Sequence, residues 1–209
     1  MVNTTSQASW WYDFSHGIAY HFFTHAFDTE ARYLSPIPST GGLLVVSNHL
    51  SFLDPPVVAA FLKRPVYFVA RKTLFRHPLF ARLISSLHAF PIDQDNPDIA
   101  SLRRILKHLD EGHAVLLFPE GSRSMNGLPQ PPQPGVGWIA LKARVPILPV
   151  KIKGTFEILP RGRTTLKYHP LKITYGTPRP LPAVFEQSKG KDTYFQIAQY
   201  LMQEIAALP

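Results

Sequence analysis

The chain has 209 residues, 45% of them hydrophobic, which is enough for one domain with a sizeable core. Its formal net charge of +8 favours anionic partners, and the lack of cysteine excludes disulfides, thiolate zinc sites and a cysteine nucleophile. No apolar run reaches the roughly 18 residues that a membrane-spanning helix needs. The N-terminus also lacks the basic region and apolar run of a secretory signal.

Residues 8–33 predict an amphipathic helix. Trp10, Phe14, Ile18 and Phe22 recur at four-residue steps, which places them on one face of a helix. The stripe has two interpretations: it packs on the core, or it lies in a membrane interface, where Trp and Tyr are common. The polar face has histidines and no Lys or Arg, which weakens the second interpretation. The helix alone leaves both open.

From residue 42 onward, short apolar runs alternate with helical patterns. Strands are predicted at 42–47, 66–70, 88–92, 114–118, 145–152 and 166–176, and helices at 56–62, 77–87, 97–110, 136–143 and 193–207. This alternation predicts an α/β fold, a single domain with a central β-sheet flanked by helices. The sheet should be mixed, because the last strands lack helical crossovers.

The stretch "SNHLSFLDPP", residues 47–56, joins a predicted strand to a predicted helix and contains His49 and Asp54. Residues five apart do not meet in a straight strand or helix, but here the chain turns between the two. Pro55 and Pro56 place Asp54 at the helix entrance. Asp54 is then either a helix cap beside a loop histidine, or a carboxylate that orients His49 as a general base.

The same spacing occurs a second time, in "HAFPID", between His88 and Asp93. Five steps along a strand separate two residues by about 16 Å, too far for a hydrogen bond. We therefore expect His88 to have no catalytic role.

A second polar cluster, "FPEGSRS" at 118–124, directly follows the predicted strand "AVLLF". Gly121 permits close approach of a ligand, and Ser122, Arg123 and Ser124 supply donors suited to a phosphate or other anion. The alternative is a loop whose arginine is simply solvated.

Three blocks together resemble the glycerolipid acyltransferases of the lysophosphatidic acid acyltransferase type: "NHLSFLD", "FPEGSRS" and "VPILPV" at 145–150. The resemblance covers residues 42 to 155. It implies that His49, held by Asp54, removes a proton from an acceptor hydroxyl that attacks an acyl thioester. It also implies an acyltransferase domain over 34–209, preceded by the segment 1–33.

The resemblance further implies the acceptor, lysophosphatidic acid, and the product, phosphatidic acid, in phospholipid biosynthesis. Arg123 would face the phosphate of the acceptor, and "VPILPV" would shape the site near the acyl chain. No metal or cofactor is implied, and the donor would be acyl-CoA or acyl carrier protein. The substrate-binding residues implied are Asn48, Glu120, Gly121, Ser122, Arg123, Pro146 and Pro149.

Two positions depart from the family pattern. Gln94 stands where the family usually has an arginine, and "PPQPGVG" has no lysine before its first glycine. An amide cannot replace the charge-assisted, bidentate contact of a guanidinium. A different acceptor, such as a lysophospholipid or lyso-ornithine lipid, therefore remains an alternative, as does a non-catalytic lipid-binding protein.

Between Asp54 and Asp93 the sequence has no carboxylate but many basic residues. These form either a solvated basic face or a patch for lipid headgroups or an acyl carrier. With such a patch, we expect segment 1–33 to anchor the protein, peripherally or monotopically, to an anionic membrane on its cytoplasmic side. No nucleic-acid-binding module is present, so nucleic acid is not an expected partner. The patch comprises Lys63, Arg64, Arg71, Lys72, Arg76 and Arg82.

Overall fold

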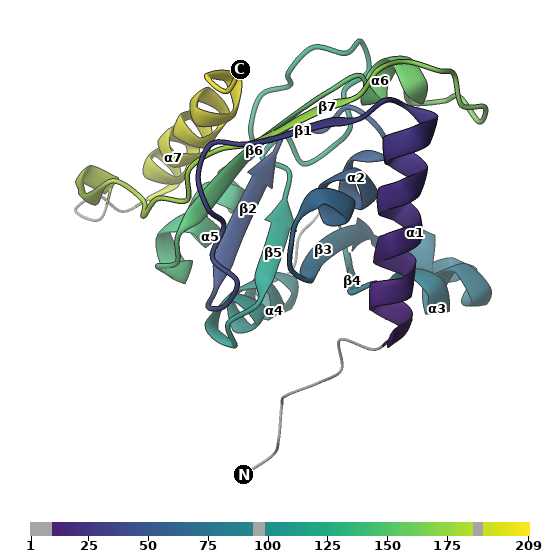
Figure 1. The fold of residues 1–209 in the computed structure, drawn as a ribbon. Coiled ribbons are helices and arrows are strands. Elements are labelled where there is room, and N and C mark those ends of the chain that lie inside the picture. Colours follow the sequence, from purple (N-terminus) through teal and green to yellow (C-terminus); the bar gives the residue numbers. More distant parts are fainter. Residues whose placement is uncertain (1–9, 94–98, 186–189) are drawn as a thin grey trace.

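A seven-stranded sheet with the strand order β1-β7-β6-β2-β5-β3-β4 forms the centre of the molecule (Figure 1). The computed structural model describes residues 10–93, 99–185 and 190–209. The strands are β1 (Glu30–Tyr33), β2 (Leu43–Ser47), β3 (Val66–Arg71), β4 (Ala89–Ile92), β5 (Ala114–Leu117), β6 (Ile147–Lys153) and β7 (Lys172–Tyr175). Strands β2 to β6 run parallel, β7 is antiparallel to β6, and β1 runs parallel to β7. The predicted mixed α/β sheet is confirmed.

Helices cover both faces of this sheet (Figure 1). The α-helices are α1 (Trp10–Ala26), α2 (Asp54–Phe61), α3 (Pro78–Ser86), α4 (Ile99–Asp110), α5 (Pro134–Ala143), α6 (Thr155–Ile158) and α7 (Lys191–Ala206). Two short 3-10 helices are η1 (Lys72–Arg76) and η2 (Ala183–Phe185). Among the described residues, none of the helices combines the length and apolar character needed to cross a bilayer.

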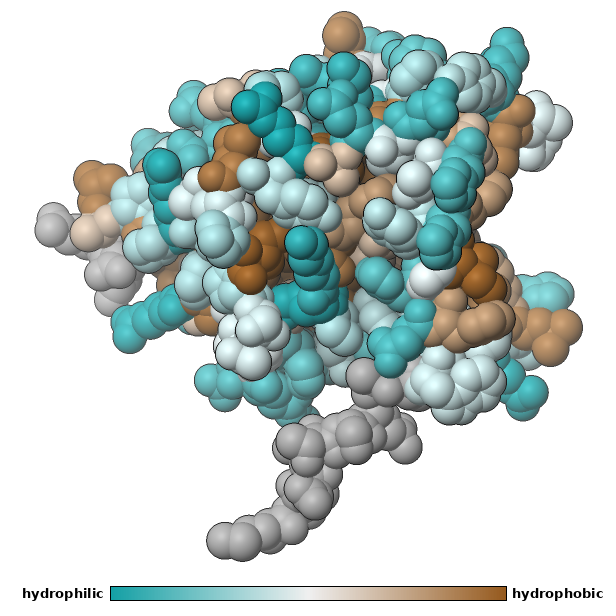
Figure 2. Space-filling view, in the orientation of Figure 1, coloured by the Kyte–Doolittle hydropathy of each residue, from teal (hydrophilic) through white to brown (hydrophobic). Residues whose placement is uncertain are grey.

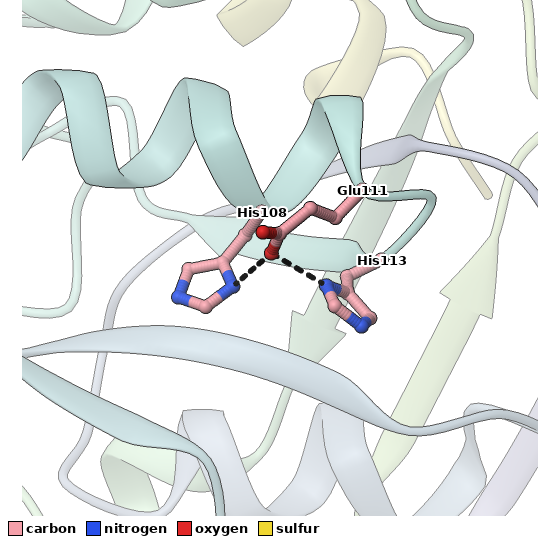
Figure 3. Close-up of side chains that lie close together, drawn as sticks. All are labelled: His108, Glu111 and His113. Atoms are coloured by element: carbon pink, nitrogen blue, oxygen red, sulfur yellow. Dashed lines mark ion pairs between the residues drawn. The ribbon is translucent and has the colours of Figure 1, made fainter. Parts of the chain in front are cut away.

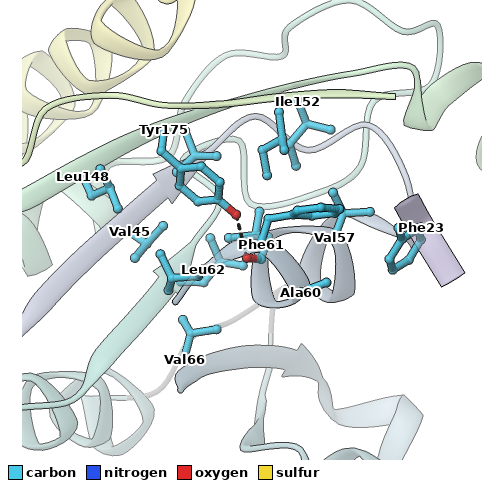
Figure 4. Packing of buried hydrophobic residues seen from close by; sticks show 14 of the residues in the cluster. Phe23, Val45, Val57, Ala60, Phe61, Leu62, Val66, Leu148, Ile152 and Tyr175 are labelled. Carbon is cyan, nitrogen blue, oxygen red and sulfur yellow. Dashed lines mark hydrogen bonds between the residues drawn. The ribbon is translucent and has the colours of Figure 1, made fainter. Parts of the chain in front are cut away.

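Strand β2 lies between two hydrophobic clusters. Its side chains alternate between the faces of the sheet, so Leu43 and Val45 pack in the cluster with α1 and α2. Leu44 and Val46 pack in the cluster with α4, α5 and α7. Figure 4 shows part of the first cluster, in which the buried Tyr175 hydroxyl donates to the backbone oxygen of Val58 at 2.8 Å. Hydrophobic packing on both faces of the sheet thus fixes the position of β2.

The predicted N-terminal helix is too long. It ends at Ala26, and residues 30–33 form β1 at the edge of the sheet instead. Asp28 has a left-handed backbone (φ 45°), and the Thr29 hydroxyl donates to Phe23 O at 2.6 Å, which closes the last turn. The predicted boundary at residue 33 therefore falls at the end of a strand that belongs to the sheet.

The predicted strand over 166–176 is also too long, because only Lys172–Tyr175 pair as β7. Pro170 has no N–H to donate, which interrupts a ladder at that point. Helix α6 was not predicted. The departure at Gln94 lies outside the described residues.

Candidate active site

His49 lies in the loop that joins the carboxyl end of β2 to α2. Its ring stacks on Phe118, which directly follows β5, with the ring centroids 3.9 Å apart. Because β2 and β5 are parallel neighbours, their carboxyl ends meet at the same edge of the sheet. The two motif loops therefore form one site, and such an edge is the usual place for ligands in open α/β sheets.

Asp54 fixes the His49 ring. Its carboxylate is fully buried, and Oδ2 lies 2.8 Å from His49 Nδ1. The same oxygen accepts the backbone N–H groups of Leu50 at 2.6 Å and Ser51 at 2.7 Å, and Oδ1 accepts the Thr155 hydroxyl at 2.6 Å. Because a carboxylate only accepts, Nδ1 of a neutral His49 carries the proton, and Nε2 is left as the basic nitrogen.

The helix-cap interpretation of Asp54 is wrong. Asp54 is the first residue of α2, Leu53 is the cap, and the carboxylate faces back onto the loop. The two prolines after it explain this geometry, since neither needs an acceptor for a backbone N–H in the first turn.

Glu120 holds the backbone of His49. Oε1 accepts the His49 N–H at 2.8 Å, Oε2 accepts the Gln130 N–H at 2.9 Å, and the Ser124 N–H donates to His49 O at 2.9 Å. Burial raises the pKa of Glu120 above its usual range, while the two N–H donors lower it. Each carboxylate oxygen of Glu120 thus accepts a backbone N–H group, and one of these two groups belongs to His49.

Gly121 and Ser122 lie in the turn after Glu120. Gly121 has φ +70°, and a Cβ there would lie 2.9 Å from Gln133 Cγ, so the turn requires glycine. Ser122 is exposed.

Arg123 is partly buried beside the loop that carries His49. Its guanidinium carbon lies 5.8 Å from the centroid of the Phe52 ring. Burial lowers the pKa of Arg123, and the positive charge of Arg161 lowers it further, whereas Asp54 raises it. Two arginines therefore lie close enough to repel one another near the His49–Asp54 pair, and an anion between them would relieve that repulsion.

Three other predicted binding residues do not line this site. The Asn48 amide donates to Ile152 O at 2.9 Å and accepts the Ile152 N–H at 2.8 Å, so it ties the loop to β6. Pro149 is buried in the sheet opposite Val46. Pro146 precedes β6 at the amino edge, about 20 Å along the strand from Ile152.

The six predicted basic residues do not form one patch. Arg64 donates to the carbonyl oxygens of Pro38, Gly41 and Gly112, each at 2.9 Å, and Lys63 lies over the Tyr33 ring at 5.1 Å. Strand β3, six residues or about 20 Å long, separates them from the remaining four. Those four are exposed at the end of β3, on η1 and on α3: Arg71, Lys72, Arg76 and Arg82.

Residues 29–153, more than half of the chain, match the family described as Acyltransferase. The chain belongs to the acyltransferase family. The acyltransferase is 26% identical to the 1-acyl-sn-glycerol-3-phosphate acyltransferase of Bacillus subtilis over 173 residues, 82% of this chain and 83% of that protein. It is 31% identical to a chloroplastic protein of the same name from Brassica napus over 146 residues, 68% of this chain and 42% of that protein.

The fold of this acyltransferase is similar to the crystal structure of the 1-acyl-sn-glycerophosphate (LPA) acyltransferase PlsC from Thermotoga maritima. The TM-score is 0.74 at 24% identity, covering 93% of this chain and 78% of that chain. The likeness is one of fold.

Two residues of the acyltransferase site escaped the sequence analysis. Thr155 is buried and donates a hydrogen bond to Asp54, which lies 101 residues earlier in the sequence. A single threonine gives no sequence signal of such a contact. Arg161 follows α6 in the stretch "LPRGR", and its segment reaches the site because the Ser51 hydroxyl donates to Leu159 O at 2.7 Å. The predicted non-catalytic residue, His88, precedes β4 and stacks between Tyr12 and Tyr67.

Proposed function

We propose that this acyltransferase moves a fatty acyl group from an acyl thioester to the sn-2 hydroxyl of 1-acyl-glycerol-3-phosphate, giving phosphatidic acid. The observation that carries the proposal is the His49–Asp54 pair at 2.8 Å, with Nε2 as the basic nitrogen and two arginines beside it. The names of the similar Bacillus and Brassica proteins support the same acceptor.

The proposed reaction needs one general base. Nε2 of His49 takes the proton of the acceptor hydroxyl as its oxygen attacks the thioester carbonyl. The buried Asp54 carboxylate stabilises the imidazolium that forms. When the tetrahedral intermediate collapses, an ester forms, the carbon–sulfur bond breaks, and His49 returns the proton to the leaving sulfur. Both acyl-CoA and acyl carrier protein present such a thioester, so both are candidate donors.

Arg123 and Arg161 are the proposed ligands of the acceptor phosphate. Replacing either with glutamine should raise the KM for lysophosphatidic acid about tenfold or more, since a charge-assisted hydrogen bond contributes about 1.5 to 3 kcal/mol. The KM for the donor should change little. Steady-state kinetics with both substrates varied checks this expectation.

The matched control is Arg179→Gln. Arg179 is exposed, and its backbone pairs with Ile147 at the opposite edge of the sheet. If the two site variants change the acceptor KM no more than this control does, the phosphate is held elsewhere. If wild type uses a lysophospholipid or lyso-ornithine lipid better than lysophosphatidic acid, and the two variants leave that use unchanged, those alternative acceptors gain support.

Helix α1 is the proposed membrane contact. Its inner face is buried at Tyr12 and Phe23, whereas the stripe predicted from the sequence is exposed. The exposed fractions are 76% for Trp10, 54% for Phe14, 55% for Ile18 and 44% for Phe22. The helix therefore packs on the core and also presents aromatic side chains outward, as an interfacial helix does.

Helix α3 extends this surface. The Trp11 indole donates to the Ser86 hydroxyl at 3.0 Å, which ties α3 to α1, and Leu79 and Leu83 on α3 are exposed. Figure 2 shows brown surface on the side of the molecule where α1 and α3 lie in Figure 1. The exposed cations of η1 and α3, among them Arg76 and Arg82, suit an anionic leaflet.

Replacing Trp10, Phe14, Ile18 and Phe22 together with glutamine should weaken partitioning onto anionic vesicles at least tenfold. Full burial of one large apolar side chain stabilises membrane binding by about 1.5 to 3 kcal/mol. Partial burial of all four side chains therefore contributes more than the free energy of a tenfold change in partitioning. Vesicle sedimentation measures the partitioning. Val184→Ser, at an exposed apolar residue on η2, is the control. Equal partitioning of the quadruple variant and wild type would place the membrane contact on another surface.

A further inference from the structure

Two imidazole nitrogens converge on one carboxylate oxygen at the corner between α4 and β5. His108 lies in the last turn of α4, and Glu111 and His113 lie in the turn that follows (Figure 3). The Nδ1 atoms of His108 and His113 are each 3.7 Å from Glu111 Oε2. One ligand atom from each of the three residues lies within 4.8 Å of the other two.

The two histidine rings are held in place by packing. Tyr67 of β3 lies 4.3 Å from the His108 ring and 4.8 Å from the His113 ring, measured between centroids. Phe90 of β4 contacts the His108 ring as well, at 5.3 Å. The nitrogens are thus fixed by the aromatic side chains of two neighbouring strands.

The Nδ1 atoms of His108 and His113 are both buried. Within the described residues, neither Nδ1 atom has a hydrogen-bond partner, and both are shielded from solvent. A separation of 3.7 Å is too long for a hydrogen bond to Glu111. Buried polar atoms normally have a partner, so the arrangement calls for a group between the three side chains.

We propose that His108, Glu111 and His113 bind a divalent transition-metal ion, with Zn²⁺ the best match. Tetrahedral zinc bonds to imidazole nitrogen and carboxylate oxygen at about 2.0 to 2.2 Å, which sets neighbouring ligand atoms roughly 3.4 Å apart. The two nitrogen–oxygen separations of 3.7 Å exceed this by a few tenths of an ångström. Glu111 is exposed, so its side chain is free to close the gap.

The ligand chemistry selects the class of ion. Two imidazoles and one carboxylate suit Zn²⁺, Co²⁺, Ni²⁺ or Cu²⁺, whereas Mg²⁺ and Ca²⁺ prefer sites made of oxygen alone. Lys107 Nζ lies 3.7 Å from the other carboxylate oxygen of Glu111, Oε1, and leaves Oε2 to the ion. A fourth position remains for water.

The metal site is separate from the proposed catalytic site. It precedes β5, at the amino edge of the sheet, whereas His49 lies at the carboxyl edge. An ion there would join the end of α4 to the start of β5 and stabilise that corner. The inference therefore stands independently of the proposed acyl transfer.

The test is a calorimetric titration of the full chain, without a polyhistidine tag, with ZnCl₂ and with MgCl₂. We expect one zinc ion per chain and no binding of magnesium at the same concentrations. His108→Phe and His113→Phe keep an aromatic ring against Tyr67 but remove the nitrogen. Each variant should weaken zinc binding at least tenfold. Residues that only hydrogen-bond to a metal ligand already contribute about 10- to 100-fold to metal affinity, and the ligand itself should contribute no less.

Two further variants test whether zinc binds at this corner and whether the carboxylate takes part. His21 and His25 are exposed and stack one turn apart on α1, a second pair able to bind zinc, so the double variant His21→Gln/His25→Gln should retain the affinity. Glu111→Gln removes the carboxylate without changing a ring and should also weaken binding. Zinc should raise the melting temperature of wild type and fail to do so in His113→Phe. Affinity retained within tenfold in the three site variants, or lost only in the His21/His25 variant, would overturn the proposal.

Discussion

His49→Ala is expected to lower kcat for acyl transfer by about 10²- to 10⁴-fold, the usual contribution of a positioned general base. The variant loses the basic Nε2 atom, while the Asp54 carboxylate keeps its bonds to Leu50, Ser51 and Thr155. The loop should therefore keep its shape. Steady-state assays at saturating substrate measure kcat, and circular dichroism verifies the fold.

The control for this variant is the other histidine with the same spacing to an aspartate. His88 has a left-handed backbone (φ 66°), which asparagine tolerates, so His88→Asn is the conservative replacement. It removes a stacked ring between Tyr12 and Tyr67 and should affect stability more than kcat. A His49→Ala enzyme within tenfold of wild type, or a larger kcat loss in His88→Asn, would remove His49 from the reaction.

Asp54→Asn is expected to lower kcat by a similar factor, about 10²- to 10⁴-fold, while leaving the protein folded. The amide oxygen can replace Oδ2, which accepts from His49, Leu50 and Ser51. The amide nitrogen would replace Oδ1 and donate to the Thr155 hydroxyl, which can rotate to accept. The variant therefore keeps the geometry and loses the charge that stabilises the imidazolium.

Thr155→Val distinguishes the effect of the Asp54 charge from the effect of the hydrogen bonds that shape the site. It removes one of the hydrogen bonds to Asp54 but keeps the carboxylate, so kcat should fall much less than in Asp54→Asn. Leaving Oδ1 buried without a donor should destabilise the fold by about 1 to 3 kcal/mol. If Asp54→Asn keeps wild-type kcat, the carboxylate acts only on the shape of the loop.

Local pattern was enough to predict most of the sheet and its helices. Strand β2 has four consecutive apolar residues followed by Ser47, and all five are buried. The errors came where the partner of a segment is far away in sequence. β1 reads as the end of a helix and becomes a strand only because β7, more than 130 residues later, pairs with it.

Within the site, the sequence identified the residue types better than their contacts. His49 and Asp54 could be predicted because the chain turns between them, and the structure places them 2.8 Å apart. The motif does not reveal which way Glu120 points, and its carboxylate faces the backbone of His49. Asn48 is similarly engaged with Ile152, because an amide matches the donor and acceptor of one backbone residue.

The most direct test of the proposed acyl transfer is an assay of the full chain on vesicles that contain lysophosphatidic acid, with acyl-CoA and acyl carrier protein supplied in separate reactions. Mass spectrometry of the lipid product identifies both the acceptor and the position acylated. We predict phosphatidic acid acylated at sn-2 with at least one of the two donors, and its loss in His49→Ala. Phosphatidic acid formed equally well by His49→Ala, or no phosphatidic acid with either donor from a folded, vesicle-bound wild-type protein, would contradict the account.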